Sequence, residues 1–502
     1  MSYQSVSTIL SKEYNLDNDI LEENVVVGGW IRTIRRGTKV SFCELNDGSS
    51  SKSLQLIINS DEKFTPLSTR GQTGCGLQCK GNIVKSPAKG QLVELIVTEL
   101  LYFSPHIDER YPIAKAKISL PYLRAKQHLR QRTKTFNSVF RIRSQVLLAT
   151  HKFFGDINKF SFINPNILTT SDCEGAGEVF TVTELMKINK TSSIPVVKDT
   201  DIIDYDKDFA NKQMYLTVSS QLQLEAMSLG LGNVYTTNKS FRAEHSSTNK
   251  HLCEFEHLEI EWCFRNLNQL MDITEEYIKF ICREILDKCN NEVKMLNGFM
   301  SKGLIDRLQH IVTNGFIRLT HQEAIDILLA DIESGLIKLS SHPSFTKLSE
   351  KKQRGIRRKY TVFDNEPKHK EDLATEFENY LTEKFNAPVF VHTWHKGIKP
   401  FYMKHIIGTD LVENFDLIMP YGVGELVGGS QREDIYETLV SEMEDKVENK
   451  DALDWYVDLR KYGSVPHGGF GCGLDRLVML CTGMTHVRDV VPFPNAHEFI
   501  NY

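Results

Sequence analysis

Charged and apolar side chains alternate along the segment Phe241 to Glu261, FRAEHSSTNKHLCEFEHLEIE, at close to the spacing of a β-strand. This alternation predicts two short antiparallel strands around a polar loop from His245 to Asn249, with every second side chain on the same side. Arg242 and Glu244 then share one face. The shared face of the return strand carries Phe255, His257, Glu259 and Glu261. Burying unpaired charges is costly, so the segment is either the lining of a pocket or a solvated hairpin with scattered ion pairs.

A second pattern is the glycine-rich turn that opens the segment Gly468 to Leu480, GGFGCGLDRLVML, and leads into an apolar helix with Arg476 in its first turns. Glycines let the backbone approach a ligand closely, and a guanidinium there can hold phosphate oxygens through paired, charge-assisted hydrogen bonds. Glycine turns before helices are common, so this pattern gains weight only beside the first one.

Two further patterns predict elements of a fold. Apolar residues recur at helical spacing over residues 138–159, which predicts a long amphipathic helix. The β-rich runs Val25 to Val27, Gln55 to Asn59 and Gln91 to Leu101 are separated by Gly, Ser and Asp and predict strands of an N-terminal β domain. A small barrel of this kind can bind single-stranded nucleic acid on exposed aromatic side chains.

The distribution of charge matters more than its sum. The net charge is −5, yet residues 115–143 hold nine Lys or Arg and no acidic residue, and Arg32, Arg35, Arg36 and Lys39 cluster in the N-terminal β region. The first stretch is either a phosphate-contacting hinge or a solvated linker and helix face. The basic stretch 347–370 is either an exposed loop or an RNA contact.

Composition places the chain among ordinary globular proteins. Its 502 residues are 41% hydrophobic and 25% charged, which suits about two to four domains with ample core. No apolar run reaches the roughly 18 residues that a membrane span needs, and residues 1–20 resemble neither a signal nor a transit peptide. We therefore expect a cytoplasmic protein without a membrane partner, and we expect its ten scattered cysteines to be reduced.

Taken together, FRxE with HLxEF and GxGxxR resemble motifs 2 and 3 of the class II aminoacyl-tRNA synthetases. The resemblance covers nearly the whole chain and narrows to the aspartyl/asparaginyl subgroup, within which the chain is similar to the bacterial-type asparaginyl enzymes. The segments VGGWIR (27–32) and FINPNILTTSDCEGAGEVF (162–180) resemble the OB-fold and the end of motif 1 of this subgroup. The segments that resemble the bacterial-type asparaginyl enzymes are LTVSSQLQLE (216–225), GELVGGSQRE (424–433), YGSVPHGGF (462–470) and VRDVVPFP (487–494).

This resemblance implies an α+β fold, in which an N-terminal OB-fold β-barrel precedes a class II catalytic domain built on an antiparallel β-sheet flanked by helices. The implied domains are an anticodon-binding barrel (1–103), a basic hinge or linker (104–131) and the catalytic domain (132–502). Residues 265–395 match the family least. The helix of residues 138–159 and the strand before Pro165 would form the interface of a homodimer.

The implied reaction joins L-asparagine and ATP to asparaginyl-adenylate and pyrophosphate, and then transfers the amino acid to the 3′ end of tRNA(Asn). By resemblance, Arg242 holds the α-phosphate and the substrate carboxylate, Glu244 and Phe255 hold adenine, and His251 and Arg476 hold the γ-phosphate. Because negative charge accumulates at phosphorus, this step needs fixed cations and a metal more than a general base.

Other roles follow from the same resemblance. Glu425 would hold Mg²⁺ with Asp416 or Asp475 assisting. The α-amino group of the substrate would be bound by Glu174, Ser219 and Gln221, and its side chain by Glu259 and Arg432. In the barrel, Phe42 would stack on an anticodon base while Gln55 and Glu94 read base edges, although Phe42 in the core is an alternative.

Two positions oppose aspartate as the substrate. Leu224 stands where aspartyl enzymes carry a lysine, and Glu259 stands where they carry the shorter aspartate. A neutral amide could donate to Glu259 and accept from Arg432, whereas an aspartate would meet like charge in a desolvated site. The alternatives are an aspartyl-tRNA synthetase, possibly non-discriminating, an asparagine synthetase-like paralogue and a non-catalytic RNA-binding paralogue.

The chain departs from the family at three places. Leu474-Asp475 replaces the usual Phe-Glu of motif 3, Lys250 replaces an arginine of motif 2, and Asn495 replaces the last residue of an FPR sequence. A lysine in place of arginine gives up bidentate geometry.

Overall fold

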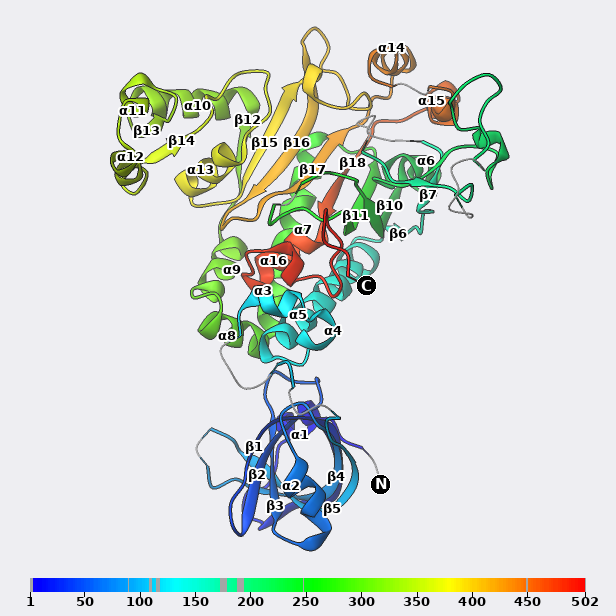
Figure 1. Ribbon diagram of the computed structural model, residues 1–502. Helices are drawn as coiled ribbons and strands as arrows, with labels where there is room; N and C mark the ends of the chain where they lie inside the picture. The colour runs from blue at the N-terminus through cyan, green and yellow to red at the C-terminus, as the bar shows by residue number, and fades with distance from the viewer. Residues whose placement is uncertain are drawn as a thin grey trace. The chain divides into compact units, whose positions relative to one another are not determined.

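The computed structural model describes residues 3–88, 90–107, 111–113, 118–171, 178–186, 194–246, 248–447 and 450–501. The chain divides into two compact units. The first comprises residues Met1–Ile142 and Cys289–Lys302, and the second comprises Arg143–Lys288 and Gly303–Tyr502. Figure 1 shows the barrel of the first unit in blue and the large sheet of the second in green, yellow and red.

The first unit is built on a closed five-stranded barrel with strand order β1-β2-β3-β5-β4. Its strands are β1 (Ile20–Arg35), β2 (Val40–Asn46), β3 (Leu54–Asn59), β4 (Gly76–Lys85) and β5 (Val93–Ser104). The short helices α1 (Val6–Ser11) and α2 (Thr65–Arg70) pack Val6, Ile9 and Leu67 into its core. Closure leaves no unpaired sheet edge, and the predicted β domain is confirmed.

Three helices follow the barrel, and one more is contributed from later in the chain. They are α3 (Leu120–Arg124), α4 (Gln127–Arg130), α5 (Lys134–His151) and α8 (Asn290–Phe299). A π-helical stretch, Lys152–Ile157, continues α5. The amphipathic helix expected over residues 138–159 is therefore confirmed, with an earlier start. Its apolar stripe is core, since Val139, Ile142 and Val146 are buried.

The second unit is organised by an eight-stranded sheet of order β12-β15-β16-β17-β18-β11-β10-β6. The strands are β6 (Ser161–Phe162), β10 (Asn233–Phe241), β11 (Glu254–Cys263), β12 (Ile317–Thr320), β15 (Val389–His395), β16 (Leu411–Met419), β17 (Gly424–Gln431) and β18 (His467–Gly473). Neighbouring strands from β15 to β10 are antiparallel, whereas β12 and β6 join the two edges in parallel. The α+β class and the antiparallel core of the catalytic sheet agree with expectation.

Helices cover this sheet along most of its width. α7 (Leu267–Lys288) packs against β16, β17 and β18, α16 (Leu474–Thr482) against β11 and β18, and α6 (Gln221–Leu231) against β10 and β11. The remaining helices of the unit are α9 (Leu304–Thr313), α10 (His321–Glu333), α11 (Pro343–Thr346), α12 (Glu350–Arg357), α13 (Thr375–Phe385), α14 (Tyr436–Lys446) and α15 (Asp454–Lys461).

The region that matched the family least, residues 265–395, contributes both sheet and periphery. It supplies α7 and the strands β12 and β15, and it also forms a lobe of α10 to α13 with the parallel pair β13 (Ile337–Leu339) and β14 (Thr361–Phe363). This lobe lies beside the β12 edge in Figure 1, and its Leu328, Phe363 and Phe377 share one apolar core with side chains of β15 and β16. The basic stretch 347–370 lies within it and contains α12, in which no residue is buried.

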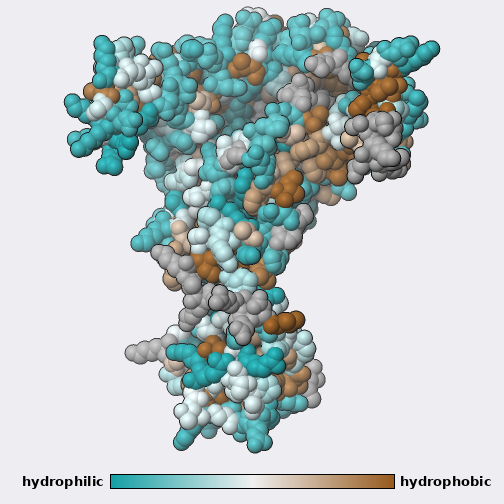
Figure 2. All heavy atoms as spheres, in the orientation of Figure 1, coloured by the Kyte–Doolittle hydropathy of each residue, from teal (hydrophilic) through white to brown (hydrophobic). Residues whose placement is uncertain are grey.

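A small three-stranded sheet completes the second unit, with β9 (Met214–Leu216) between β7 (Leu168–Thr169) and β8 (Thr181–Val182). Figure 2 shows a mostly hydrophilic face, with hydrophobic surface gathered near α6, β7 and α15. The nine described cysteines are all free. Among the described residues, none of the helices is long and apolar enough to cross a membrane.

Candidate active site

A cavity of about 360 Å³ opens on one face of the central sheet of the second unit. Strands β11, β17 and β18 line it, together with the loop between β10 and β11 and the start of α16. The return strand of the predicted hairpin presents Phe255, His257, Glu259 and Glu261 to this cavity, as its alternation predicted. The pocket interpretation is thereby confirmed. The outgoing strand ends at Phe241, so Arg242 and Glu244 reach the cavity from the loop.

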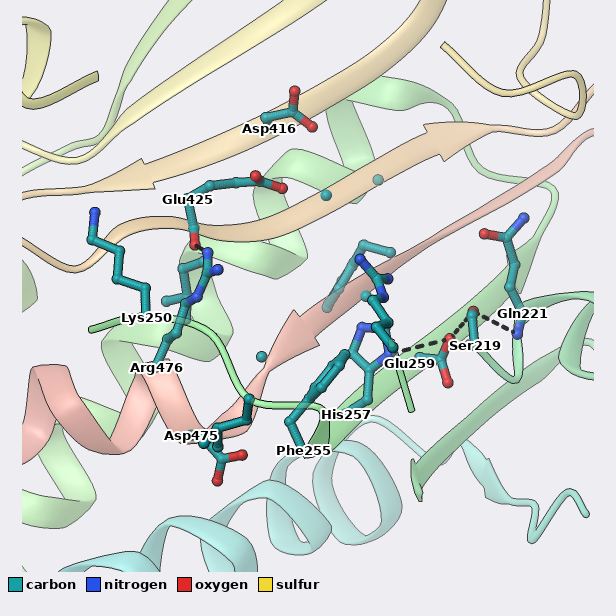
Figure 3. Close-up of a pocket in the computed structure, with 18 of the residues that line it drawn as sticks. Ser219, Gln221, Lys250, Phe255, His257, Glu259, Asp416, Glu425, Asp475 and Arg476 are labelled. Carbon is teal, nitrogen blue, oxygen red and sulfur yellow. Dashed lines mark hydrogen bonds and ion pairs between the residues drawn. The ribbon is translucent and has the colours of Figure 1, made fainter. Parts of the chain in front are cut away.

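One end of the cavity is rich in cationic and basic side chains. Arg242, Lys250, His251 and Arg476 all line it and are partly buried. The Arg476 guanidinium donates to the main-chain carbonyl of Glu425, and Figure 3 shows the two residues side by side with Lys250. Burial lowers the pKa of His251. The nearby Arg476 lowers this pKa further, whereas Glu244 raises it. This end therefore brings three cationic side chains and a histidine to one part of the cavity wall.

The ammonium group of Lys250 lies against the backbone of Gly424. A Cβ on Gly424 would collide with Lys250 Nζ and would lie 3.3 Å from Glu378 Oε2. The φ angle of Gly424 is +74°, a left-handed conformation that L side chains rarely adopt. Glu378 comes from α13, and burial followed by the nearby Glu425 raises its pKa to about 7. Burial also lowers the pKa of Lys250, with Glu378 opposing the shift.

Two carboxylates lie on neighbouring strands beside this end. Asp416 on β16 and Glu425 on β17 each place one oxygen 3.5 Å from the position that a Cβ on Gly428 would occupy. Lys399 Nζ donates to the other oxygen of Asp416 at 2.8 Å. Burial raises the pKa of Asp416 to about 6, against the effect of Lys399. A pair of hard oxygen donors that leaves other coordination positions to phosphate oxygens and water suits Mg²⁺.

Asp475 is differently placed. One of its oxygens accepts from the Arg143 guanidinium, and the other accepts from the main-chain N–H of Glu256 at 3.1 Å. Figure 3 shows its carboxylate pointing away from Glu425 and Asp416. Its contacts tie the first turn of α16 to α5 and β11, so its side chain has a structural function in this geometry.

The other end of the cavity is closed and saturated with hydrogen bonds. The Glu259 carboxylate accepts a hydrogen bond from the Ser219 hydroxyl. It also accepts from the main-chain N–H of Ser220, whose nitrogen lies 2.9 Å from Glu259 Oε2. Gln221 begins α6 directly after these serines. This arrangement clamps the start of α6 to β11, and Figure 3 shows Ser219, Gln221 and Glu259 together at this end.

Arg432 is 3% exposed and is fixed by Glu261, not by Glu259. Its Nε lies 3.1 Å from Glu261 Oε1, its NH2 donates to the same oxygen, and its NH1 donates to Ser430 Oγ at 2.6 Å. A guanidinium held in this way has a single orientation, since each of its three nitrogens donates to a fixed oxygen, and N–H groups of NH1 and NH2 are left for a ligand.

Aromatic groups lie between the two ends. The guanidinium of Arg242 stands 5.5 Å from the centre of the Phe255 ring, and that ring lies 5.5 Å from the His257 ring. Gly471 on β18 faces His257 so closely that any side chain there would displace it. The absence of a Cβ thus leaves room for the His257 ring beside Phe255.

The structure brings most of the candidate residues into this one cavity. They are Ser219, Gln221, Arg242, Glu244, His251, Phe255, Glu259, Asp416, Glu425, Arg432, Asp475 and Arg476. Glu174 lies outside the described residues. Three groups escaped the sequence reasoning: Glu261 as the partner of Arg432, Lys399 as the partner of Asp416, and Glu378. Their partners are separated from them by up to 171 residues, so the only available signal was the alternation that placed Glu261 on the pocket face.

The barrel candidates lie on the outside of the first unit. Phe42 is 41% exposed and is therefore not part of the core. Its neighbours in register are Arg35 on β1 and Ile57 on β3. Gln55 donates to Glu94 at 3.2 Å, and the same oxygen of Glu94 accepts from Ser86 Oγ at 3.1 Å. Glu94 is 7% exposed, so it can be reached only through its free oxygen or by displacing these donors.

Comparisons with known proteins agree with this geometry. Residues 121–497 match the family tRNA synthetases class II (D, K and N), and residues 25–101 match the family OB-fold nucleic acid binding domain. The asparagine–tRNA ligase of Clostridium kluyveri is 39% identical over 97% of this chain and 98% of its own length. The chloroplastic/mitochondrial asparagine–tRNA ligase of Arabidopsis thaliana is 38% identical over 94% of this chain and 79% of its own.

A solved structure shares the fold over the same extent. It is the asparaginyl-tRNA synthetase of Pyrococcus horikoshii complexed with asparaginyl-adenylate, which is 26% identical, has a TM-score of 0.78 and covers 99% of this chain and 98% of its own.

Proposed function

The chain belongs to the asparagine–tRNA ligases of the class II tRNA synthetase family, and from this membership we propose that its cavity activates L-asparagine with ATP and passes the amino acid to tRNA(Asn). The observation that supports the proposal most directly is a single cavity that is lined by Arg242, Lys250, His251 and Arg476 at one end and holds the buried Arg432 guanidinium, fixed by Glu261, at the other. Such a cavity can take a polyphosphate and a small polar amino acid together.

In the first step, the α-carboxylate of asparagine attacks the α-phosphorus of ATP and pyrophosphate leaves. Negative charge grows on the α-phosphate oxygens, so fixed positive groups stabilise the transition state without reorganising. We assign Arg242 to the α-phosphate and the substrate carboxylate. Arg476 and His251 bind the γ-phosphate, and Lys250 joins them as a compact ammonium. Phe255 stacks on adenine and Glu244 accepts from it.

Mg²⁺ would be held by Glu425 with Asp416. Asp475 is left out of this assignment because both of its oxygens already have donors. When bound, the ion neutralises phosphate charge. The chain's own part is to keep the two carboxylates apart and oriented, which Lys399 does for Asp416 at 2.8 Å.

Recognition of the amino acid is assigned to the closed end. Ser219 and Gln221 bind the α-amino group, and Glu174 completes this set by family resemblance. Arg432 donates to the side-chain oxygen of asparagine, and Glu259 accepts from its amide nitrogen. Because Glu259 also accepts from Ser219 and Ser220, its charge is fixed where an aspartate carboxylate would have to lie. An aspartate would thus meet like charge in a desolvated site.

We further propose that the domain boundaries lie near residues 103 and 131 and that the barrel binds the anticodon through Phe42, Gln55 and Glu94. A homodimer through α5 and β6 is supported by exposed apolar side chains on the second unit, namely Leu148, Ile157 and Phe162. Such side chains in one region are typical of a protein–protein interface. A cytoplasmic location remains a prediction.

The test is ATP–pyrophosphate exchange with asparagine and with aspartate, measured side by side with Mg²⁺ and without tRNA. Exchange with asparagine and not with aspartate is the expected result. Exchange with aspartate would instead favour an aspartyl enzyme. Exchange with neither amino acid, in a protein that still binds tRNA, would favour a non-catalytic RNA-binding role.

A further inference from the structure

A buried carboxylate without an assigned role lies directly behind the closed end of the cavity. Glu225 is on α6, one turn after Gln221, and is fully buried. Its contacts come from three other segments. Tyr456 and Arg460 belong to α15, His467 belongs to β18, and Arg432 directly follows β17. An ionised carboxylate at such depth is costly unless every lone pair is matched.

One oxygen of Glu225 is anchored away from the cavity. Glu225 Oε2 accepts from Tyr456 Oη at 2.7 Å and from Arg460 NH2 at 2.9 Å, and it lies 3.1 Å from His467 Nε2. Arg460 also donates from Nε to the main-chain carbonyl of Glu433 at 2.8 Å. These contacts fix the carboxylate plane in one orientation.

The other oxygen faces two residues that the proposed function assigns to asparagine. Glu225 Oε1 accepts from Gln221 Nε2 at 3.0 Å and lies 3.8 Å from Arg432 Nε. Gln221 and Arg432 come from segments far apart in the chain, and Glu225 is the group that touches both. The orientation set by Tyr456 and Arg460 is thereby transmitted to the amino-acid end of the cavity.

Arg432 lies within a cluster of buried charged groups. Two guanidiniums, Arg432 and Arg460, face two carboxylates, Glu225 and Glu261, and all four are almost completely buried. Burial alone would raise the pKa of Glu225, but Arg460, His467 and Arg432 hold it well below its usual range. Burial raises the pKa of Glu261 to about 7, against the effect of Arg432. Glu225 is therefore the carboxylate of the two that stays negative, and it lies 3.8 Å from Arg432 Nε, behind the cavity wall.

We propose that Glu225 is a positioning and specificity-determining residue for asparagine: it holds Gln221 in place and supplies negative charge behind Arg432, which makes Arg432 accept an amide and reject a carboxylate. This inference rests on the proposed function. It assigns discrimination against aspartate partly to a group behind the cavity wall, in addition to Glu259 inside it.

The decisive variant is Glu225→Gln, which keeps the size of the side chain and removes its charge. An amide has one acceptor oxygen and cannot accept from Gln221 on one side and from Tyr456 and Arg460 on the other, so Gln221 loses its fixed orientation and Arg432 loses the negative charge behind it. We expect the KM for asparagine in pyrophosphate exchange to rise about tenfold or more, as for an unmatched buried polar group. We expect the KM for ATP to stay within about twofold, and the ratio of kcat/KM for asparagine to that for aspartate to fall about tenfold.

A second variant separates position from charge and keeps the test informative if Glu225→Gln does not fold. Tyr456→Phe removes one hydrogen bond to Glu225 Oε2 and leaves the charge in place. We expect the KM for asparagine to rise about threefold to fivefold, with discrimination against aspartate unchanged, for the loss of one hydrogen bond.

The matched control for Tyr456→Phe is Tyr380→Phe. Tyr380 Oη donates to Asp331 at 2.8 Å beside Lys384, which is the same combination of tyrosine, carboxylate and cation, within the lobe formed by α10 to α13. Loss of the Tyr380 hydroxyl should leave the KM for asparagine and the KM for ATP unchanged.

The outcomes distinguish this inference from the proposed function. If the unmodified protein shows no asparagine-dependent exchange, the proposed function fails. If the unmodified protein is active while folded Glu225→Gln keeps its KM for asparagine and its discrimination, the inference is overturned. A fall in kcat and melting temperature without a selective change in the KM for asparagine would likewise reduce Glu225 to a structural residue. If Glu225→Gln does not fold, an unchanged KM for asparagine in Tyr456→Phe overturns the inference.

Discussion

The two ends of the cavity use charge in opposite ways. At the end marked by Ser219, Gln221 and Glu259 in Figure 3, every charged group has a fixed partner, and Arg432 is 3% exposed. At the end marked by Lys250, Glu425 and Arg476, the basic groups are only partly buried and line the cavity beside the carboxylates of Glu425 and Asp416. A saturated site can reject a substrate that differs in one charge, whereas an unsaturated site can bind a highly charged group and release its product.

The largest effect is expected where the two ends meet. Arg242→Ala removes the cation that stands over Phe255 and is assigned to both the α-phosphate and the substrate carboxylate. We expect asparagine-dependent pyrophosphate exchange to fall about 10³-fold, the upper value for loss of one preorganised charge at a developing oxyanion. The free energy of unfolding and tRNA binding, measured on the same preparation, should change little. Exchange at the unmodified rate would remove Arg242 from the reaction.

Glu259→Gln tests the closed end alone. The variant removes the fixed negative charge and places an amide against the Ser219 hydroxyl and the Ser220 N–H. We expect the KM for asparagine to rise about 30-fold, consistent with a buried polar mismatch of about 2 kcal/mol. The KM for ATP should stay constant, and relative use of aspartate should increase. If asparagine affinity and discrimination are both unchanged, the amino-acid end has been misplaced.

Gly424→Ala is the counterpart at the open end. The new methyl group would collide with Lys250 Nζ and would also force a left-handed φ of +74° on alanine. We expect the KM for ATP to rise about tenfold while the KM for asparagine is unchanged, because a displaced ammonium loses charge-assisted contact with phosphate.

Gly422→Ala is the matched control for that prediction, since Gly422 has a φ of +80° in the same turn and open space at its Cβ position. It carries the backbone strain without the collision. An equal rise in the KM for ATP in both variants would attribute the effect to the strained turn and would leave Lys250 without a role in binding ATP.

Sequence reasoning succeeded where residues that act together are close in the chain. The alternation of residues 255–261 predicted the pocket face of β11, and the glycine turn before Arg476 predicted the start of α16. It failed for pairs formed by the fold. The pairing of Arg432 with Glu261 was not predicted, because the strand register and not the spacing decides which carboxylate reaches the guanidinium. Asp475 resembled a metal ligand until Arg143, 332 residues earlier, was found to occupy one of its oxygens.

The smallest effect on the first step is expected from the barrel, which gives a control outside the cavity. Phe42 is 41% exposed on β2, between Arg35 and Ile57 of the neighbouring strands. Phe42→Ala should leave the rate of pyrophosphate exchange and the KM values for asparagine and ATP unchanged. It should raise the KM for tRNA in aminoacylation about fivefold, the lower range for loss of one base–aromatic stack. Tyr102→Ala, which removes another aromatic side chain, 60% exposed, on β5, is the control. If both variants charge tRNA equally well, the anticodon contact lies on another face of the barrel, and the comparison between the two ends of the cavity is unaffected.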